Sequence, residues 1–237
     1  ESTKRFAVEK RHIPDPVVKV LYNGIPLDGM VRVDREWVES FRGEQGLKPG
    51  DRILGIVGRI EGHKGHIDAL KAFRLVLKER NDVYVWIVGN GRYQNEVSVW
   101  IKENHLEDRV TLLGYRSDVL KILQCFDLQI FPSHMEGTPN TLYEAMLAGN
   151  APVASTTDGQ GEILEDGKTA LMFEAGDYEK MAELILKLLK DDELRKRISG
   201  NVRERIKDFD MKRTIAALES TYERIMDDRF SPARKSG

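Results

Sequence analysis

Two carboxylates, Glu136 and Glu144, enclose the stretch Glu-Gly-Thr-Pro-Asn-Thr-Leu-Tyr-Glu. The first lies in a turn rich in glycine and proline, and the second lies in the helix that this turn is expected to begin. A helix start presents unpaired backbone N–H groups and the positive end of the helix dipole, which favours an anion such as a diphosphate. Carboxylates accept hydrogen bonds from sugar hydroxyls. The spacing therefore indicates a ligand that is part phosphate and part polyol.

A second loop, residues 58–65, carries cations that suit the same ligand. It reads Gly-Arg-Ile-Glu-Gly-His-Lys-Gly. Gly58 and two further glycines let the backbone approach a ligand, Arg59 offers a planar fork of donors, and Lys64 offers a compact charge. Taken alone, a tight strand-to-helix turn with two solvated cations explains this loop equally well.

Two further loops combine glycine with polar residues. Residues 114–118 read Gly-Tyr-Arg-Ser-Asp, and residues 156–162 read Thr-Thr-Asp-Gly-Gln-Gly-Glu. In the first loop, Ser117 or Asp118 is a candidate N-cap of the next helix, while the functional interpretation places the loop beside a nucleobase. Taken singly, Glu136 is most simply a first-turn carboxylate and Glu144 an ordinary helix residue. The cationic, glycine-rich and acidic loops together favour a binding site.

The elements that position these loops alternate along the chain. Apolar, β-branched stretches predict strands at 17–22, 52–57, 83–88, 110–113, 128–131, 153–155 and 170–173. Apolar residues at helical spacing predict helices at 35–45, 66–80, 93–104, 119–126 and 140–148, and three more at 178–189, 193–209 and 211–226. This order predicts an α/β fold with a Rossmann-like, doubly wound parallel sheet and extra C-terminal helices. Ligands of such folds bind beyond the carboxyl ends of the strands, where all four loops lie.

Composition excludes several other classes of protein. The 37 Lys and Arg nearly balance 39 Asp and Glu, so no general basic field indicates nucleic acid. Cys125 is the single cysteine, which excludes an intrachain disulfide and predicts a reducing, cytoplasmic location. No apolar run has the length of a membrane span, and no signal peptide is expected from the pattern of these residues. The chain begins at Glu1 rather than Met, which indicates a piece of a longer protein.

Together these features resemble the family 4 glycosyltransferases of the GT-B fold, specifically their C-terminal, donor-binding domain. The similarity runs from about residue 17 to the last helix. It rests, in order, on Asn23-Gly24-Ile25, Gly58-Arg59, Lys64-Gly65, Gly114 with Asp118, Phe131-Pro132-Ser133, Glu136-Gly137, Glu144-Ala145-Met146, and Asp158-Gly159 with Glu162. The two glutamates separated by seven residues are the specific part of this pattern.

The resemblance implies roles for the site residues. Arg59, Lys64 and Glu136 would be catalytic: the cations would hold the donor diphosphate and stabilise the leaving nucleotide, and Glu136 would bind hydroxyls of the transferred sugar. Glu144 would bind the ribose. The other donor-binding residues would be Gly58, Arg116, Gly137, Thr138, Pro139, Asn140 and Thr141. The donor would be a UDP- or GDP-type sugar, with no metal and no separate cofactor.

The resemblance also implies the wider organisation. A retaining enzyme of polysaccharide biosynthesis would transfer a hexose-type sugar to a glycan or lipid-linked acceptor, held mainly by an N-terminal domain and with peripheral membrane association left open. Residues 1–16 would be a linker or remnant of that domain, 17–210 the donor-binding domain, 211–228 a helix crossing back, and 229–237 a disordered tail. The chain by itself would bind nucleotide weakly and transfer little sugar.

Three alternatives remain open. A glycoside hydrolase also uses two carboxylates across a sugar, although it does not need Arg59 and Lys64. A nucleotide-sugar epimerase shares the two-domain scaffold, and a non-catalytic sensor domain would bind nucleotide without turnover. A dinucleotide site is disfavoured, because Gly89-Asn90-Gly91 lacks a third glycine at the required spacing.

Overall fold

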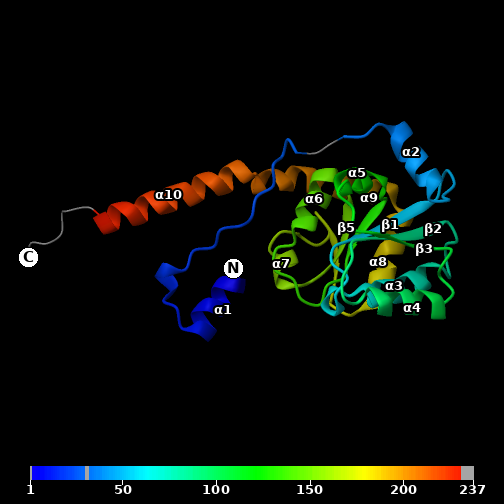
Figure 1. The fold of residues 1–237 in the computed structure, drawn as a ribbon, viewed down its shortest axis with the longest axis horizontal. Coiled ribbons are helices and arrows are strands. Elements are labelled where there is room, and N and C mark those ends of the chain that lie inside the picture. Colours follow the sequence, from blue (N-terminus) through cyan, green and yellow to red (C-terminus); the bar gives the residue numbers. More distant parts are fainter. Residues whose placement is uncertain (1, 30–31, 231–237) are drawn as a thin grey trace, which may run out of the picture.

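Six parallel strands form the centre of the molecule in a computed structural model, which describes residues 2–29 and 32–230 (Figure 1). The strand order is β3-β2-β1-β4-β5-β6. The strands are β1 (Arg52–Val57), β2 (Val83–Val88), β3 (Val110–Gly114), β4 (Leu128–Phe131), β5 (Ala151–Ser155) and β6 (Leu171–Phe173). All adjacent pairs are parallel. The predicted doubly wound, Rossmann-like fold is therefore confirmed.

The strand order reverses between β1 and β4. β1 pairs with β2 on one side and with β4 on the other, where Leu54 lies opposite Leu128. Right-handed crossovers carry the chain to opposite faces of the sheet from these two strands. Their following loops therefore separate and leave a crevice at the carboxyl edge, which is where doubly wound folds bind ligands.

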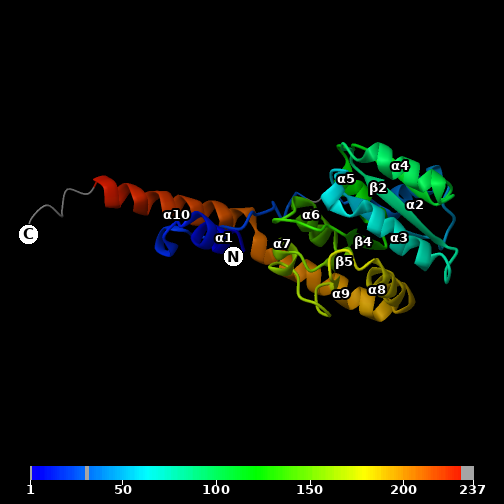
Figure 2. The same ribbon diagram turned by 90° about the horizontal axis from the view of Figure 1, so that it is seen from below.

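Helices cover both faces of the sheet. α3 (His66–Val76) and α4 (Gln94–Glu103) lie on one face, while α2 (Arg35–Glu44), α5 (Val119–Ile122) and α6 (Asn140–Ala148) lie on the other (Figures 1 and 2). α8 (Tyr178–Lys190) packs against α3, and α9 (Asp192–Arg205) packs against α6. Neighbouring strand residues enter separate apolar clusters, with Leu54 in one and Ile53 in the other. Burial on both faces explains why the strands are almost wholly apolar.

The predicted strand at 17–22 is wrong. This segment has no strand beside it, and Val17 is 69% exposed. A β-branched sequence forms a strand only where another strand can pair with its backbone. The chain instead docks a little further on, where the Ile25 N–H donates to Phe209 O (2.9 Å) and the Met211 N–H donates to Ile25 O (3.1 Å).

Two helices lie where none was specified. α1 (Ser2–Arg11) occupies most of the segment expected to be a linker or a remnant, and α7 (Asp158–Gly161) follows β5. Other element ends differ from the predictions by a few residues, and at some of the helix ends a short 3₁₀ segment follows the α-helix. An example is the 3₁₀ turn Ile206–Phe209 after α9.

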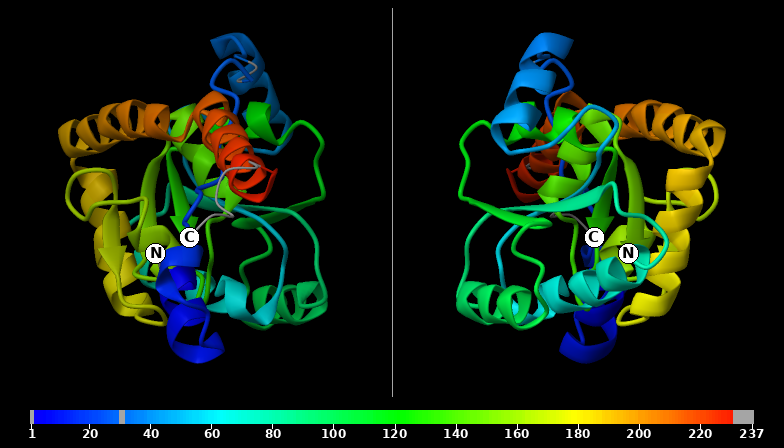
Figure 3. Two further views of the ribbon diagram at one scale, coloured as in Figure 1. Left: turned by 90° about the vertical axis from the view of Figure 1, so that its left-hand side faces the viewer. Right: turned by 90° about the vertical axis from the view of Figure 1, so that its right-hand side faces the viewer.

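The last helix, α10 (Met211–Phe230), leaves the body of the molecule and points toward the viewer in the left panel of Figure 3. It includes the first residues of the predicted tail, 229–237; residues 231–237 lie outside the described part. Its apolar positions are exposed, with Ile215 at 48% and Tyr222 at 61%. In the described residues no helix is both long and apolar enough to cross a bilayer.

Candidate functional site

A cavity of about 400 Å³ opens at the crevice between the loops after β1 and β4. The predicted site residues that line it are Gly58, Arg59, Lys64, Glu136, Pro139, Asn140 and Thr141. Ile56, Val57, His66, Ile130, Phe131, Pro132 and Ser133 complete the lining. The parallel sheet therefore brings together two loops that are distant in the sequence. Lys64 and Glu136, which contact each other here, are 72 residues apart.

Two helices begin at this cavity without side-chain caps. α3 follows Gly65, whose φ is 69°, and α6 follows Pro139; neither of these N-cap residues makes a side-chain hydrogen bond to its helix. An alanine at Gly65 would overlap the carbonyl oxygen of Pro132, so glycine is required where the two loops meet. Uncapped N–H groups together with the helix dipoles make the cavity attractive to an anion.

The site cation and the site carboxylate contact each other. Lys64 Nζ forms an ion pair with Glu136 Oε2, and the two side chains are 19% and 13% exposed. The Ser133 hydroxyl donates to the same carboxylate oxygen (3.1 Å). Lys64 thereby holds Glu136 toward the cavity. A bound diphosphate can take over part of the interaction with Lys64 and free oxygens of Glu136 for hydroxyl donors.

Hydrogen bonds to its backbone fix the loop that carries Glu136. The His134 N–H donates to His63 O (2.8 Å), and the Ser155 hydroxyl donates to Ser133 O (2.6 Å). The Gly159 N–H, in α7, donates to Glu136 O (3.2 Å). The loop after β4 is thus attached both to the loop after β1 and to the segment after β5.

Glu144 lies one turn further along α6. It does not line the cavity itself, but it follows Thr141 and Asn140 at the i+3 and i+4 spacings that share one helix face. Burial raises the pKa of the Glu144 carboxyl above its ordinary value of 4.5, and no hydrogen bond to its side chain is found among the described residues. A half-buried carboxylate of this kind can be stabilised by hydroxyl donors from a ligand.

The remaining predicted residues lie apart from the cavity lining. Arg116 donates to both carboxylate oxygens of Asp118 (2.8 Å each) and lies over the ring of Phe41. Gly137 is exposed, and Thr138 lines a neighbouring small pocket. The structure therefore brings together Arg59, Lys64 and Glu136, the residues predicted to bind phosphate and sugar. Arg116 instead forms an ion pair with Asp118 of its own loop, after β3.

Among the lining residues that the sequence analysis did not assign to the site, Ser133 and His66 are the polar ones. Ser133 orients Glu136, and its position two residues after a buried strand, in the Phe131-Pro132-Ser133 motif, was the available signal. His66 is the first residue of α3; burial, together with the charge of Lys64, lowers its pKa to about 4, so its imidazole is neutral. Neither ring nitrogen has a partner among the described residues.

The two glutamates do not form a hydrolase-like pair. Glu136 is held by Lys64, whereas Glu144 is absent from the described lining of the cavity. A pair of carboxylates that acts across one glycosidic bond has to face a common space. Among the described residues, no cluster of three or more His, Cys, Asp or Glu side chains is placed to hold a metal ion.

Replacing Glu144 with glutamine tests whether burial of its carboxylate destabilises the folded chain. Because the folded-state pKa is raised, the carboxylate destabilises the folded chain at neutral pH, and this penalty disappears as the pH falls below 4.5. Glu144→Gln should therefore raise the melting temperature at pH 7 and leave it unchanged under acidic conditions. Melting curves of both proteins across this range, recorded by circular dichroism, measure the effect; a lower melting temperature at pH 7 would contradict it.

Comparison with known proteins agrees with the fold and with the family resemblance. The family model described as "Glycosyl transferases group 1" matches residues 38–205. N-acetyl-alpha-D-glucosaminyl L-malate synthase of Bacillus anthracis is 27% identical over 216 residues, which are 91% of this chain and 56% of that protein. The chain spans about half the length of the curated relatives it matches.

Solved structures share the fold at lower identity. Anabaena Alr3699/HepE, solved in complex with UDP, superimposes with a TM-score of 0.86 at 22% identity, over 94% of this chain and 62% of that one. The C-terminal domain of a glycosyl transferase group 1 family protein, LpcC of Francisella tularensis, gives 0.69 at 21% identity, over 78% of this chain and 97% of that one. The predicted family resemblance is confirmed, and the chain belongs to the group 1 glycosyl transferases.

Proposed function

We propose that this chain is the donor-binding half of a retaining glycosyltransferase that uses a nucleoside-diphosphate sugar. The observation that carries the proposal is the cavity at the strand-order reversal, where Arg59, Lys64 and two uncapped helix starts converge. Positive charge from four separate sources suits a diphosphate whose negative charge increases as it departs. In this proposal Glu136, which contacts Lys64 at the same cavity, binds the hydroxyls of the transferred sugar.

In the proposed reaction, the bond between the anomeric carbon of the donor sugar and the diphosphate oxygen breaks. An acceptor hydroxyl oxygen bonds to that carbon from the same face, and the hydroxyl proton passes to an oxygen of the departing diphosphate. Arg59 and Lys64 neutralise the leaving group, so the proposal calls for no divalent metal. Activity of the whole protein should accordingly persist in EDTA.

Each remaining site residue has a place in this proposal. The N–H groups of Asn140 and Thr141 contact the phosphates, Gly58 lets the diphosphate approach the backbone, and Glu144 binds the ribose. Gly137, Thr138 and Pro139 form the turn around the sugar, and Arg116 borders the base. A uridine donor is favoured, because the structural neighbour from Anabaena was solved with UDP. A hexose-type sugar is in keeping with the name of the Bacillus relative, which refers to N-acetyl-glucosamine.

The wider organisation is part of the same proposal. Residues 17–210 form the donor-binding domain, and residues 211–228 cross to a second domain that carries most of the acceptor site, with 1–16 at the junction. The exposed apolar positions of α10 support this, because a stripe of this kind is normally covered in a folded protein. The acceptor is a glycan or a lipid-linked saccharide, and the site of action is the cytoplasm, at the membrane surface where the acceptor is lipid-linked.

A thermal-shift panel of UDP, GDP, ADP and their glucose conjugates tests the proposal. A ligand that binds only the folded state raises the melting temperature by mass action. UDP and UDP-glucose should raise it and ADP should not. The shift should be reduced in Glu144→Gln, where a charge-assisted hydrogen bond becomes a neutral one and affinity falls about tenfold. No shift with any nucleotide would contradict donor binding, and an unchanged shift in the variant would contradict the ribose assignment.

A further inference from the structure

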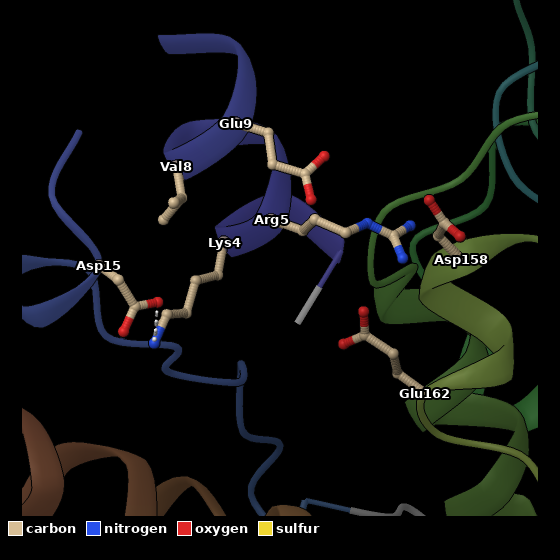
Figure 4. Close-up of a pocket in the computed structure, with 7 residues that line it drawn as sticks. All are labelled: Lys4, Arg5, Val8, Glu9, Asp15, Asp158 and Glu162. Atoms are coloured by element: carbon tan, nitrogen blue, oxygen red, sulfur yellow. Dashed lines mark ion pairs between the residues drawn. The ribbon is translucent and has the colours of Figure 1, made fainter. Parts of the chain in front are cut away.

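A second pocket, of about 490 Å³, lies between α1 and α7. Figures 1 and 2 agree that the start of α1 faces α7. α1 contributes Lys4, Arg5, Val8 and Glu9, and Asp15 follows it, while Asp158 of α7 and Glu162 form the opposite wall. Figure 4 shows the Arg5 side chain extending from α1 across the pocket toward Asp158 and Glu162.

The chemistry of this pocket differs from that of the donor cavity. Among its described lining residues, Val8 alone is apolar, and four carboxylates outnumber two cations. Lys4 is already paired with Asp15 (3.1 Å). An excess of carboxylates opposes a second anion, and a lining in which Val8 is the one apolar side chain among the described residues opposes a wholly hydrophobic ligand. A neutral polyhydroxylated molecule fits both kinds of group, because its hydroxyls donate to carboxylates and accept from Arg5.

α7 links the pocket to the donor loop, because its residue Asp158 lines the pocket and its residue Gly159 contacts the loop that carries Glu136. The Gly159 N–H donates to Glu136 O, and the Gly159 Cα packs against the carbonyl of Gly137 so closely that a Cβ would overlap it. A smaller pocket of about 260 Å³ shares Lys4 and Glu162 with the larger one, and it is also lined by Thr138, which precedes Pro139 of the donor cavity. Tyr22, which lines the smaller pocket, donates a hydrogen bond to Glu162 Oε2 (2.9 Å).

We infer that the pocket between α1 and α7 binds the neutral sugar ring of the acceptor and presents one of its hydroxyls to the donor sugar at Glu136. Part of the acceptor site therefore lies on this chain, although most of it was expected on a separate domain. The inference rests on the proposed function, because only a donor in the adjacent cavity makes a bound sugar an acceptor. Asp158 and Glu9 accept from hydroxyls of the ring, and Arg5 donates to its oxygens.

Titration of the full chain with neutral methyl glycosides tests the inference. Methyl α-glucoside, methyl α-galactoside and methyl N-acetyl-α-glucosaminide would be added in the presence of saturating UDP, with affinity followed by saturation-transfer NMR. At least one should bind, and Asp158→Asn combined with Glu9→Gln should weaken it at least tenfold while changing UDP affinity less than twofold. Glu183→Gln is the matched control, since Glu183 is an exposed carboxylate paired with Lys180 outside both pockets.

Hydrogen exchange supplies a second readout that does not depend on the variants. The bound glycoside should slow exchange in residues 2–11 and 158–161, but not in residues 59–65. If none of the glycosides binds, if the double variant binds as tightly as the unaltered chain, or if the sugar displaces UDP, the inference is wrong. A failure of UDP itself to bind would instead contradict the proposed function, so the two failures are distinguishable.

Discussion

Replacing Lys64 with methionine should weaken UDP binding about a hundredfold. A charge-assisted hydrogen bond to phosphate contributes about 1.5–3 kcal/mol, and each 1.4 kcal/mol corresponds to about a factor of ten in affinity. The substitution also leaves Glu136 unpaired at 13% exposure, so its negative charge then faces the incoming diphosphate. Both effects act in the same direction. Isothermal titration of Lys64→Met and the unaltered chain with UDP measures the loss.

The double variant separates these two effects. Adding Glu136→Gln to Lys64→Met removes the unpaired carboxylate, so about tenfold of the lost affinity should return. Lys190→Met is the control for charge alone, because Lys190 pairs with Glu79 on the surface and both side chains are more than half exposed. If Lys64→Met binds UDP as tightly as Lys190→Met does, Lys64 is not a phosphate ligand.

Gly159→Ala should destabilise the chain and abolish most nucleotide binding, whereas Gly161→Ala in the same short helix should do neither. A Cβ at Gly159 would overlap the carbonyl oxygen of Gly137 and come within 2.9 Å of Glu136 O. Backbone on both sides cannot move without displacing the loop that carries Glu136. Overpacking of this kind costs about 1–3 kcal/mol. A Cβ at Gly161 meets nothing within 4 Å, and alanine favours a helix over glycine.

Chemical denaturation and UDP titration of the two alanine variants give the comparison. Gly159→Ala should unfold at lower denaturant concentration and bind UDP at least tenfold more weakly, because its donor loop is displaced. Gly161→Ala should match or slightly exceed the stability of the unaltered chain. Equal behaviour of the two variants would mean that the contact between α7 and the donor loop does not position Glu136.

Local patterns predicted most of the sheet and one side of the site. β1, β2, β4 and α6 have the predicted bounds, because each is a strongly patterned segment ended by glycine or proline. From alternation alone, the carboxyl edge of a parallel sheet could be identified as the place where residues 58–65 and 132–139 meet. These inferences need only properties of neighbouring residues.

Features that depend on distant contacts were not predictable in the same way. The ion pair of Lys64 with Glu136 joins residues 72 positions apart, and the bond from Tyr22 to Glu162 spans 140. α7 contains two glycines among four residues, so its helical form opposes local propensity and depends on packing against the donor loop. The predicted strand at 17–22 is the reverse case. Its residues favour a strand locally, but no neighbouring strand is available to pair with its backbone.

The central claim is that the nucleotide diphosphate binds at the strand-order reversal between β1 and β4. NMR titration of the isotopically labelled chain with UDP tests it most directly, because each backbone amide reports separately. The account predicts the largest shifts in residues 58–66 and 137–144, with small shifts in residues 2–11. Largest shifts elsewhere, such as the far edge of the sheet at the starts of β4 and β5, would contradict it.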